Sequence, residues 1–160
     1  MSTFALDYRS PRAWWITGSF VLAVVLVGGA IGISALPDAW YVSLHKAPWN
    51  PPNWVFGPAW FTLYVLIGIA GARTFMRNAR SPQMLLWVAQ MILNFAWSPV
   101  WFSLHQIWPA FGVISAILVL ILAFIWNSWK VDRVAAWLFV PYALWVAFAS
   151  TLNLSIALLN

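Results

Sequence analysis

Cysteine is absent from this chain of 160 residues, and acidic side chains are almost absent. Without cysteine there is no disulfide framework, no thiolate nucleophile and no metal site with a cysteine ligand. The acidic residues are Asp7, Asp38 and Asp132, and each lies outside the long apolar segments. Hydrolytic catalysis by positioned carboxylates is therefore not expected inside the apolar part of the protein.

Charge as a whole is scarce, and apolar residues take its place. Charged residues make up 7% of the chain and apolar residues 64%, which is outside the usual range for soluble domains. The apolar residues form runs of twenty or more, which suits membrane-spanning helices. The short alternating strands of a membrane β-barrel are missing from the pattern.

Five segments satisfy the length and composition of a membrane span. At about 1.5 Å per residue each can cross roughly 30 Å of hydrocarbon in helical form. The first is too long for a cleaved signal peptide and is expected to remain as the first helix. The predicted fold is all-α, a single membrane domain over residues 1–160 built as a five-transmembrane-helix bundle, with helices at about 14–36, 55–75, 84–104, 107–129 and 134–158.

Basic residues lie between these spans and predict the topology. Seven of the eight fall in loops on one side of the membrane, namely Arg9, Arg12, Arg73, Arg77, Arg80, Lys130 and Arg133. Only Lys46 falls on the other side. The positive-inside rule then places the N-terminus inside and the C-terminus outside, in the cytoplasmic membrane if the source is bacterial. Because the charges are not gathered on one face, the lipid bilayer and not a nucleic acid is the expected partner.

One long loop, residues 37–54, connects the first two spans on the outer side. It contains Pro37, Pro48, Pro51 and Pro52. Each proline fixes its own φ angle and restricts the residue before it, so the loop should be stiff. We expect it to form a lid over the outer end of the bundle.

The chain has fourteen tryptophans, and most of them lie near span ends. That position is typical of the interfacial aromatic belt, to which Trp87 and Trp101 are also assigned. Trp60, Trp97 and Trp145 differ because they lie within spans. An indole N–H at that depth needs a hydrogen-bond partner.

Polar and aromatic residues recur at helical spacing on three spans, and the three faces should meet. Together with small residues they would leave a slot lined by flat rings, which is the usual composition of a ligand site. An alternative is that Asn94 and Ser98 only join helices by hydrogen bonds. The candidate faces are Trp60 and Tyr64, then Gln90, Asn94, Trp97 and Ser98, then Tyr142, Trp145, Ala149 and Asn153.

Two weaker signals leave alternatives open. His45 and His105 could bind haem iron, but both lie at the outer interface, where a solvated histidine is the expected state, so no metal site is predicted. Residues 28–32 contain a GxxxG pair, which permits close helix contact either within the bundle or in a homodimer.

Four segments carry a specific pattern of residues. They are Trp-Tyr at 40–41, residues 46–60 with Trp-Asn-Pro-Pro at 49–52, Asn-Phe-Ala-Trp-Ser-Pro at 94–99, and Val-Pro-Tyr-Ala-Leu-Trp at 140–145. With this content and separation the chain resembles the TspO/MBR family of tryptophan-rich sensory proteins and translocator proteins. The resemblance extends over all five spans.

The resemblance implies a five-helix membrane protein, often a homodimer, that binds porphyrins such as protoporphyrin IX and haem without an obligatory cofactor. Animal members also bind cholesterol, but residues 154–160 lack the Tyr followed by Lys or Arg of the animal pattern. Some bacterial members degrade protoporphyrin IX in light, and the tryptophans that carry this activity match Trp60 and Trp145. The implied ligand-lining positions are Tyr41, Trp49, Tyr64, Asn94, Trp97, Ser98 and Ala149, beside Trp60, Trp145 and the neighbouring Tyr142.

Three functions remain as alternatives at this point. The first is a receptor, sensor or carrier for porphyrins and other flat hydrophobic molecules. The second is a light-dependent enzyme that uses Trp60 and Trp145 to degrade porphyrin as its substrate. The third is a tetrapyrrole or sterol transporter, although intramembrane charges and broken repeat helices, the usual signs of ion-coupled transport, are missing.

Overall fold

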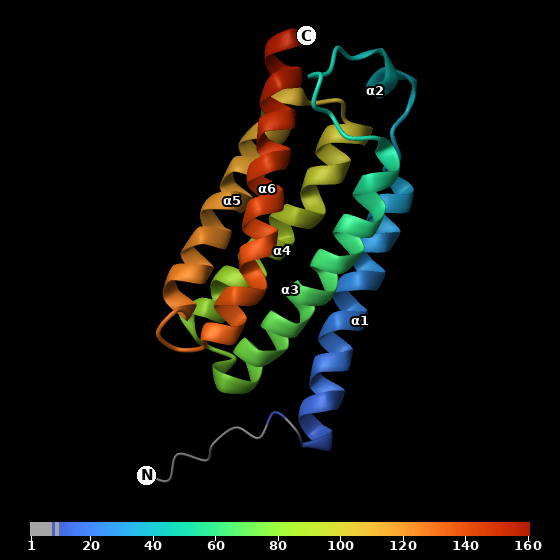
Figure 1. Ribbon diagram of the computed structural model, residues 1–160. Coiled ribbons are helices and arrows are strands. Elements are labelled where there is room, and N and C mark those ends of the chain that lie inside the picture. The colour runs from blue at the N-terminus through green and yellow to red at the C-terminus, as the bar shows by residue number, and fades with distance from the viewer. Residues whose placement is uncertain (1–7, 9) are drawn as a thin grey trace.

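The computed structural model describes Tyr8 and residues 10–160, and this part of the chain is helical without strands. Five elements are long and apolar enough to cross a membrane, which confirms the predicted five-helix class (Figure 1). The protein is an integral membrane protein. Its elements are α1 (Pro11–Ser34), α2 (Ala39–Ser43), the 3-10 helix η1 (Asn53–Val55), α3 (Phe56–Asn78), α4 (Pro82–Ser98), the π-helix η2 (Pro99–Ser103), α5 (Ile107–Ser128) and α6 (Arg133–Leu159).

Two spans begin a little earlier than predicted because serine caps precede them. The hydroxyl oxygen of Ser10 accepts a hydrogen bond from the Ala13 amide at 3.2 Å, and that of Ser81 accepts from the Met84 amide at 3.1 Å. A proline follows each serine at the first helical position, where its missing N–H costs nothing. These caps place the starts of α1 and α4 at Pro11 and Pro82.

The third predicted span, 84–104, is divided at Pro99. The α-helix ends at Ser98, and the next five residues form η2, in which the Leu104 amide bonds to the Pro99 carbonyl at 2.9 Å. Proline cannot donate an amide hydrogen to the preceding turn, so a change of hydrogen-bond pattern at this position is expected. The α-helix therefore gives way at Pro99 to the π-helix η2.

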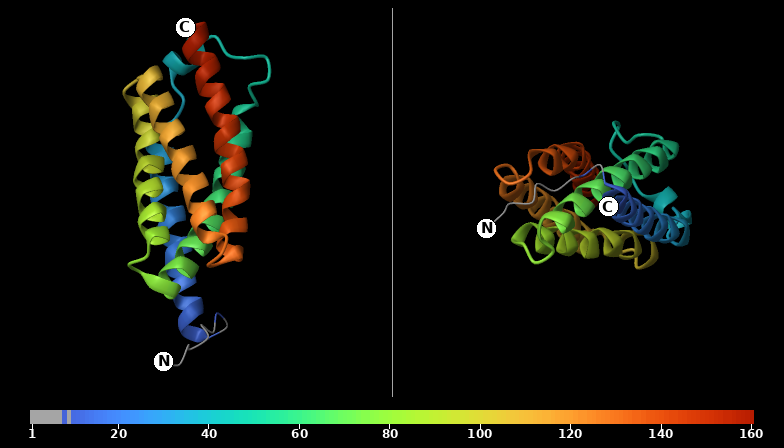
Figure 2. Two further views of the ribbon diagram at one scale, coloured as in Figure 1. Left: turned by 90° about the vertical axis from the view of Figure 1, so that its left-hand side faces the viewer. Right: turned by 90° about the horizontal axis from the view of Figure 1, so that it is seen from below.

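The five spanning helices run side by side, with α2 and the C-terminal end of α6 at one end of the bundle (Figures 1 and 2). We call this the lid end, and the opposite end the arginine end. The main packed pairs are α1 with α3, α3 with α6, α6 with α5 and α5 with α4. Consecutive spans are not close neighbours throughout, because α3 contacts α6 far more than α4. Both α3 and α4 belong to the wall of the cavity described below.

The half of the bundle toward the arginine end is closely packed. Ile67, Ala70, Ile121, Phe124 and Phe139 are all 0% exposed. The rings of Phe124 and Phe139 stack with their centroids 4.0 Å apart, which joins α5 to α6. Well-packed side chains on all sides leave no room for a ligand in this half.

Trp87 belongs to this core, so its assignment to the interfacial belt was wrong. It is 9% exposed and donates its indole N–H to the Ile67 carbonyl at 2.9 Å. Its ring lies over Gly71, where an added Cβ would come within 2.4 Å of the indole. Because Gly71 has no side chain, the Trp87 ring can pack directly against α3. The position of Trp87 along its own helix does not reveal this contact.

Gly68 sets the distance between α1 and α3, and its replacement is a stability test. A Cβ on Gly68 would lie 2.6 Å from the Cα of Val21, which is backbone and cannot rotate away. We expect Gly68→Ala to lower the free energy of unfolding by about 1 to 3 kcal/mol, because the two helices must separate. Gly18→Ala on α1 is the control, since nothing lies within 4 Å of its added Cβ. Equal stability of the two variants in a detergent unfolding titration would contradict the close contact.

Candidate functional site

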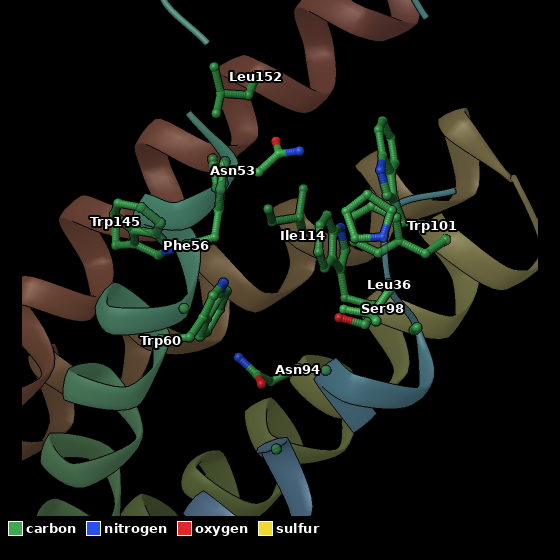
Figure 3. A pocket seen from close by; sticks show the side chains of 18 of the residues that line it. Leu36, Asn53, Phe56, Trp60, Asn94, Ser98, Trp101, Ile114, Trp145 and Leu152 are labelled. Atoms are coloured by element: carbon green, nitrogen blue, oxygen red, sulfur yellow. The ribbon is translucent and has the colours of Figure 1, made fainter. Parts of the chain in front are cut away.

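A cavity of about 790 Å³ occupies the half of the bundle next to the lid. All five spanning helices contribute to its wall, and Figure 3 shows Trp60 and Trp145 on one side of it and Trp101 on the other. The lid supplies Pro37, Tyr41, Asn50, Asn53 and Trp54. The volume lies within the range of small-molecule sites, roughly 300 to 1,000 Å³. The cavity therefore lies in the lid half of the bundle, beneath the 37–54 loop.

Ten of the thirty residues that line the cavity are aromatic. On α4 and η2, Trp97 and Trp101 stack with centroids 5.9 Å apart and planes 12° from parallel. Across the cavity Trp60 packs beside Tyr64, with centroids 5.4 Å apart. Trp145 meets Phe56 edge to face at 5.8 Å. A flat apolar molecule between these rings would find π surface on both sides.

The floor of the cavity is polar. The Tyr64 hydroxyl donates to the Asn94 side-chain oxygen at 3.3 Å, and the Asn94 amide nitrogen donates to the Tyr142 hydroxyl at 2.7 Å. Tyr142 in turn donates to the Gln90 side-chain oxygen at 3.0 Å. Higher up, the Trp97 indole donates to the Asn153 side-chain oxygen at 3.3 Å. The predicted polar stripes on α4 and α6 thus meet, and they carry hydrogen bonds between helices as well as lining the cavity.

Trp145 stands out because its indole N–H is buried and has no hydrogen-bond partner among the described residues. A buried donor without an acceptor costs about 1 to 3 kcal/mol. The residue also lines the cavity, but its indole nitrogen is covered by neighbouring protein atoms and does not face the open space.

Contacts at both ends hold the lid in place. The ring Nε2 of His105 lies 3.0 Å from the Asp38 carboxylate, and the same imidazole stacks on Trp40 with centroids 4.3 Å apart. Further along, the His45 amide donates to the Asn160 side-chain oxygen at 2.9 Å, and the Asn160 amide nitrogen donates to the His45 carbonyl at 3.0 Å. The lid is therefore fastened to the α4–α5 turn and to the end of α6.

Two ionisable groups of the lid have shifted pKa values. The Tyr41 backbone N–H, and after it His105, lower the pKa of the Asp38 carboxyl below its ordinary value. Asp38 therefore stays ionised at neutral pH, and its contacts weaken only as the pH falls through this lowered pKa and the carboxylate is protonated. Burial raises the pKa of the Tyr41 hydroxyl, so that it stays protonated.

Most of the predicted site residues meet at this cavity. Trp60 and Trp145 line the same space, as the ligand hypothesis required, and so do Tyr41, Tyr64, Asn94, Trp97, Ser98 and Ala149. Tyr142 is 0% exposed and is not among the lining residues, and its hydroxyl accepts a hydrogen bond from Asn94 beneath the floor. Trp49 is 59% exposed and is not among the lining residues, because its part of the lid turns the indole outward.

The sequence comparisons agree with this architecture. The TspO/MBR family pattern matches residues 20–159. Protein CrtK of Rhodobacter capsulatus is 39% identical over 136 residues, which cover 82% of this chain and 85% of that protein. The chain belongs to the TspO/MBR family. The tryptophan-rich sensory protein of Cereibacter sphaeroides is 33% identical over 146 residues, 91% of this chain and 92% of its own. Human translocator protein is 36% identical over 122 residues, 71% of this chain and 70% of its own.

Within this TspO/MBR chain, the most important lining residue that the sequence did not reveal is Trp101. It was assigned to the belt because it lies near a span end, but it is 1% exposed and faces the cavity beside Trp97. The spacing of four residues from Trp97 was the available signal. Pro99 between them made a shared face uncertain from sequence, and the π-helix is what brings the rings together. Further lining residues come from α1 and its C-terminal end, from the lid and the start of α3, and from α5, among them Gly32, Asn53, Phe56 and Ile114.

The histidines have structural roles at the lid. His105 contacts Asp38 and Trp40, and His45 pairs through its backbone with Asn160. Neither is among the residues that line the cavity. In the described part of the chain, no group of three His, Asp or Glu side chains could hold a metal ion.

Proposed function

We propose that this protein is a membrane receptor or carrier that binds porphyrins, such as protoporphyrin IX, and related flat hydrophobic molecules in the lid-half cavity. The observation that carries the proposal is the opposed pairs of rings around one 790 Å³ space, with Trp60 and Trp145 on one side and Trp97 and Trp101 on the other. A cavity with aromatic rings on two sides favours a planar ligand, because a flat molecule can present a face to rings on each side. Relatives named tryptophan-rich sensory protein and translocator protein are consistent with binding or transfer of a small molecule.

A porphyrin would enter with its two carboxylates toward the lid. Ionised groups lose solvation when they are buried in an apolar cavity, so they stay where water and polar groups remain. The lid provides Asn50 and Asn53 at this end. The opposite, uncharged edge of the macrocycle then reaches the floor near Tyr64 and Asn94.

Titration with protoporphyrin IX in darkness tests the proposal. Tryptophan fluorescence of the purified protein should be quenched in a saturable way. Trp145→Phe should weaken binding by about three- to tenfold, because it removes part of the aromatic surface that lines the cavity. Trp126→Phe is the matched control, since Trp126 is 84% exposed and belongs to α5 near the arginine end. No saturable quenching in the native protein, or equal affinities in both variants, would overturn the proposal.

We also propose that the lid faces the outside of the cell. Arg12, Arg73, Arg77, Arg80, Lys130 and Arg133 lie at or near helix ends at the arginine end, whereas Lys46 belongs to the lid. Arg9 lies outside the described residues. This asymmetry favours the arginine end as the cytoplasmic end. Labelling of single cysteines introduced at the lid and at the α5–α6 loop, with a membrane-impermeant reagent on intact cells, would test it: only the lid position should react.

A further inference from the structure

Four polar side chains form a continuous relay from the core to the cavity floor. The hydrogen bonds run from Tyr64 to Asn94, from Asn94 to Tyr142 and from Tyr142 to Gln90, at 3.3, 2.7 and 3.0 Å. Gln90 and Tyr142 are both 0% exposed, whereas Tyr64 and Asn94 line the cavity. The relay therefore connects a closed interior with the surface that a ligand would touch.

A single backbone carbonyl fixes the direction of every bond in this relay. The Gln90 amide nitrogen donates to the Trp87 carbonyl at 2.9 Å, and a carbonyl can only accept. The Gln90 oxygen must then face Tyr142, so the Tyr142 hydroxyl must donate its one proton to it. The hydroxyl oxygen of Tyr142 accepts a hydrogen bond from the Asn94 amide nitrogen, so the Asn94 side-chain oxygen faces Tyr64. Because that oxygen can only accept, the Tyr64 hydroxyl must donate its proton to it.

The consequence at the floor is chemical selectivity. The only hydroxyl proton of Tyr64 is engaged with Asn94, so the Tyr64 oxygen can offer a ligand nothing but lone pairs. The ring is also held in place, because it fills the space over Gly28, where a Cβ would come within 2.3 Å. The relay uses one of the two amide hydrogens of Asn94. A hydroxyl group, which donates and accepts, suits this floor better than a ketone, which only accepts.

We propose that Tyr64 is a specificity-determining residue that accepts a hydrogen bond from a donor on the leading edge of the ligand, and that Gln90 and Tyr142 impose this role from outside the cavity. The inference rests on the proposed function, because it concerns the same cavity. It selects among flat ligands those with a hydroxyl or another donor on the edge opposite their carboxylates. An ionised carboxylate has no proton to donate and is disfavoured at the floor.

A pair of porphyrins that differ in one group provides the test. Haematoporphyrin carries hydroxyethyl groups where protoporphyrin IX carries vinyl groups, on the edge opposite the carboxylates, and diacetyldeuteroporphyrin carries acetyl groups of nearly the same size there. We expect the native protein to bind the hydroxyethyl compound about tenfold more tightly in darkness, as one donor to a buried acceptor implies. The ratio of the two affinities is measured within one protein, so differences in protein quality cancel.

Substitutions then distinguish a loss of selectivity between the two porphyrins from a general loss of affinity for both. Tyr64→Phe removes the acceptor and should bring the ratio close to one. Gln90→Met removes the hydrogen bond that fixes the direction of the relay, so the Asn94 amide can flip and the Tyr64 proton can point into the cavity. The preference for the hydroxyethyl compound should then be lost or inverted, although Gln90 itself is fully buried. Tyr142→Phe breaks the middle link and tests the same step if Gln90→Met does not fold. Tyr8→Phe makes the same chemical change outside the cavity lining and should keep the native ratio.

Each outcome decides something different. If protoporphyrin IX itself does not bind the native protein, the proposed function fails. If protoporphyrin IX binds but the native ratio is near one or favours the acetyl compound, the inference about Tyr64 fails and the proposed function stands. If Gln90→Met and Tyr142→Phe fold and weaken both compounds equally, these residues only support the structure and the relay does not impose selectivity.

Discussion

Replacement of Asp132 by alanine is expected to lower the free energy of unfolding by about 3 kcal/mol, because it leaves a cation partly buried without its partner. The Asp132 carboxylate accepts from Arg73 through both oxygens, at 3.0 and 3.1 Å, and its side chain is 6% exposed. It also caps α6 by accepting from the Val134 and Ala135 amides at 3.1 and 3.2 Å. The Asp132 side chain therefore links α3 to α6 through Arg73 and also caps the N-terminus of α6.

Two further substitutions divide these roles. Asp132→Asn keeps an oxygen for the cap but loses the charge, so its loss of stability should be intermediate. Arg77→Gln should cost less than about 1 kcal/mol, because the Arg77 Nε lies 4.0 Å from the carboxylate and its side chain is 40% exposed. Unfolding by a denaturing detergent, followed by circular dichroism, measures the series. An Asp132→Ala protein as stable as Arg77→Gln would contradict the role of the pair.

Replacement of Ala149 by tryptophan is expected to weaken protoporphyrin IX binding by at least about a hundredfold, or roughly 2.7 kcal/mol. Ala149 lies on α6 and lines the cavity four residues after Trp145. A bulky ring built there would occupy the space between the aromatic walls and exclude a macrocycle. Because it enters a space that no protein atoms fill, the free energy of unfolding should change by only about 1 kcal/mol.

Leu144→Trp is the matched control for this experiment. It adds a ring to the same helix at a side chain that is 68% exposed and does not line the cavity. Binding should be unchanged, and both variants should elute and unfold like the native protein. Loss of binding in Leu144→Trp together with normal binding in Ala149→Trp would move the site to the outside of α6.

The candidate site was largely accessible from sequence because helical spacing places residues on one face. Asn94 and Ser98 at four-residue spacing, and Trp145 and Ala149 likewise, do share a face that lines the cavity. The same rule also grouped Tyr142 with them, but only part of that helix face borders the cavity, and Tyr142 lies outside this part. Tyr142 points toward Gln90 and is covered on all sides. Helical periodicity predicts the face of the helix on which a side chain lies, but not whether residues of neighbouring helices cover that side chain.

The tryptophans show the limit of reasoning from position along a span. Trp87 and Trp101 were both assigned to the interfacial belt, yet the first fills the space over Gly71 and the second stacks on Trp97. In the same way Trp49 was placed at the ligand by family resemblance and turns outward. The depth of a tryptophan in the bilayer follows from its position along its own helix. Its burial depends on which residues of other helices pack against it, and the sequence alone does not give those contacts.

The sequence by itself determined that this chain spans the membrane five times, where the helices lie, and that polar and aromatic faces on three of them belong together. Each of these follows from local chemistry: the length of the apolar runs, the breaks between them, and a repeat of 3.6 residues per turn. Only the tertiary structure decided that α3 pairs with α6, that the lid-half cavity stays open, and that the Trp87 carbonyl directs a relay ending at Tyr64. Those features depend on which surfaces meet, and hydrogen-bond direction is defined only when both partners are in place.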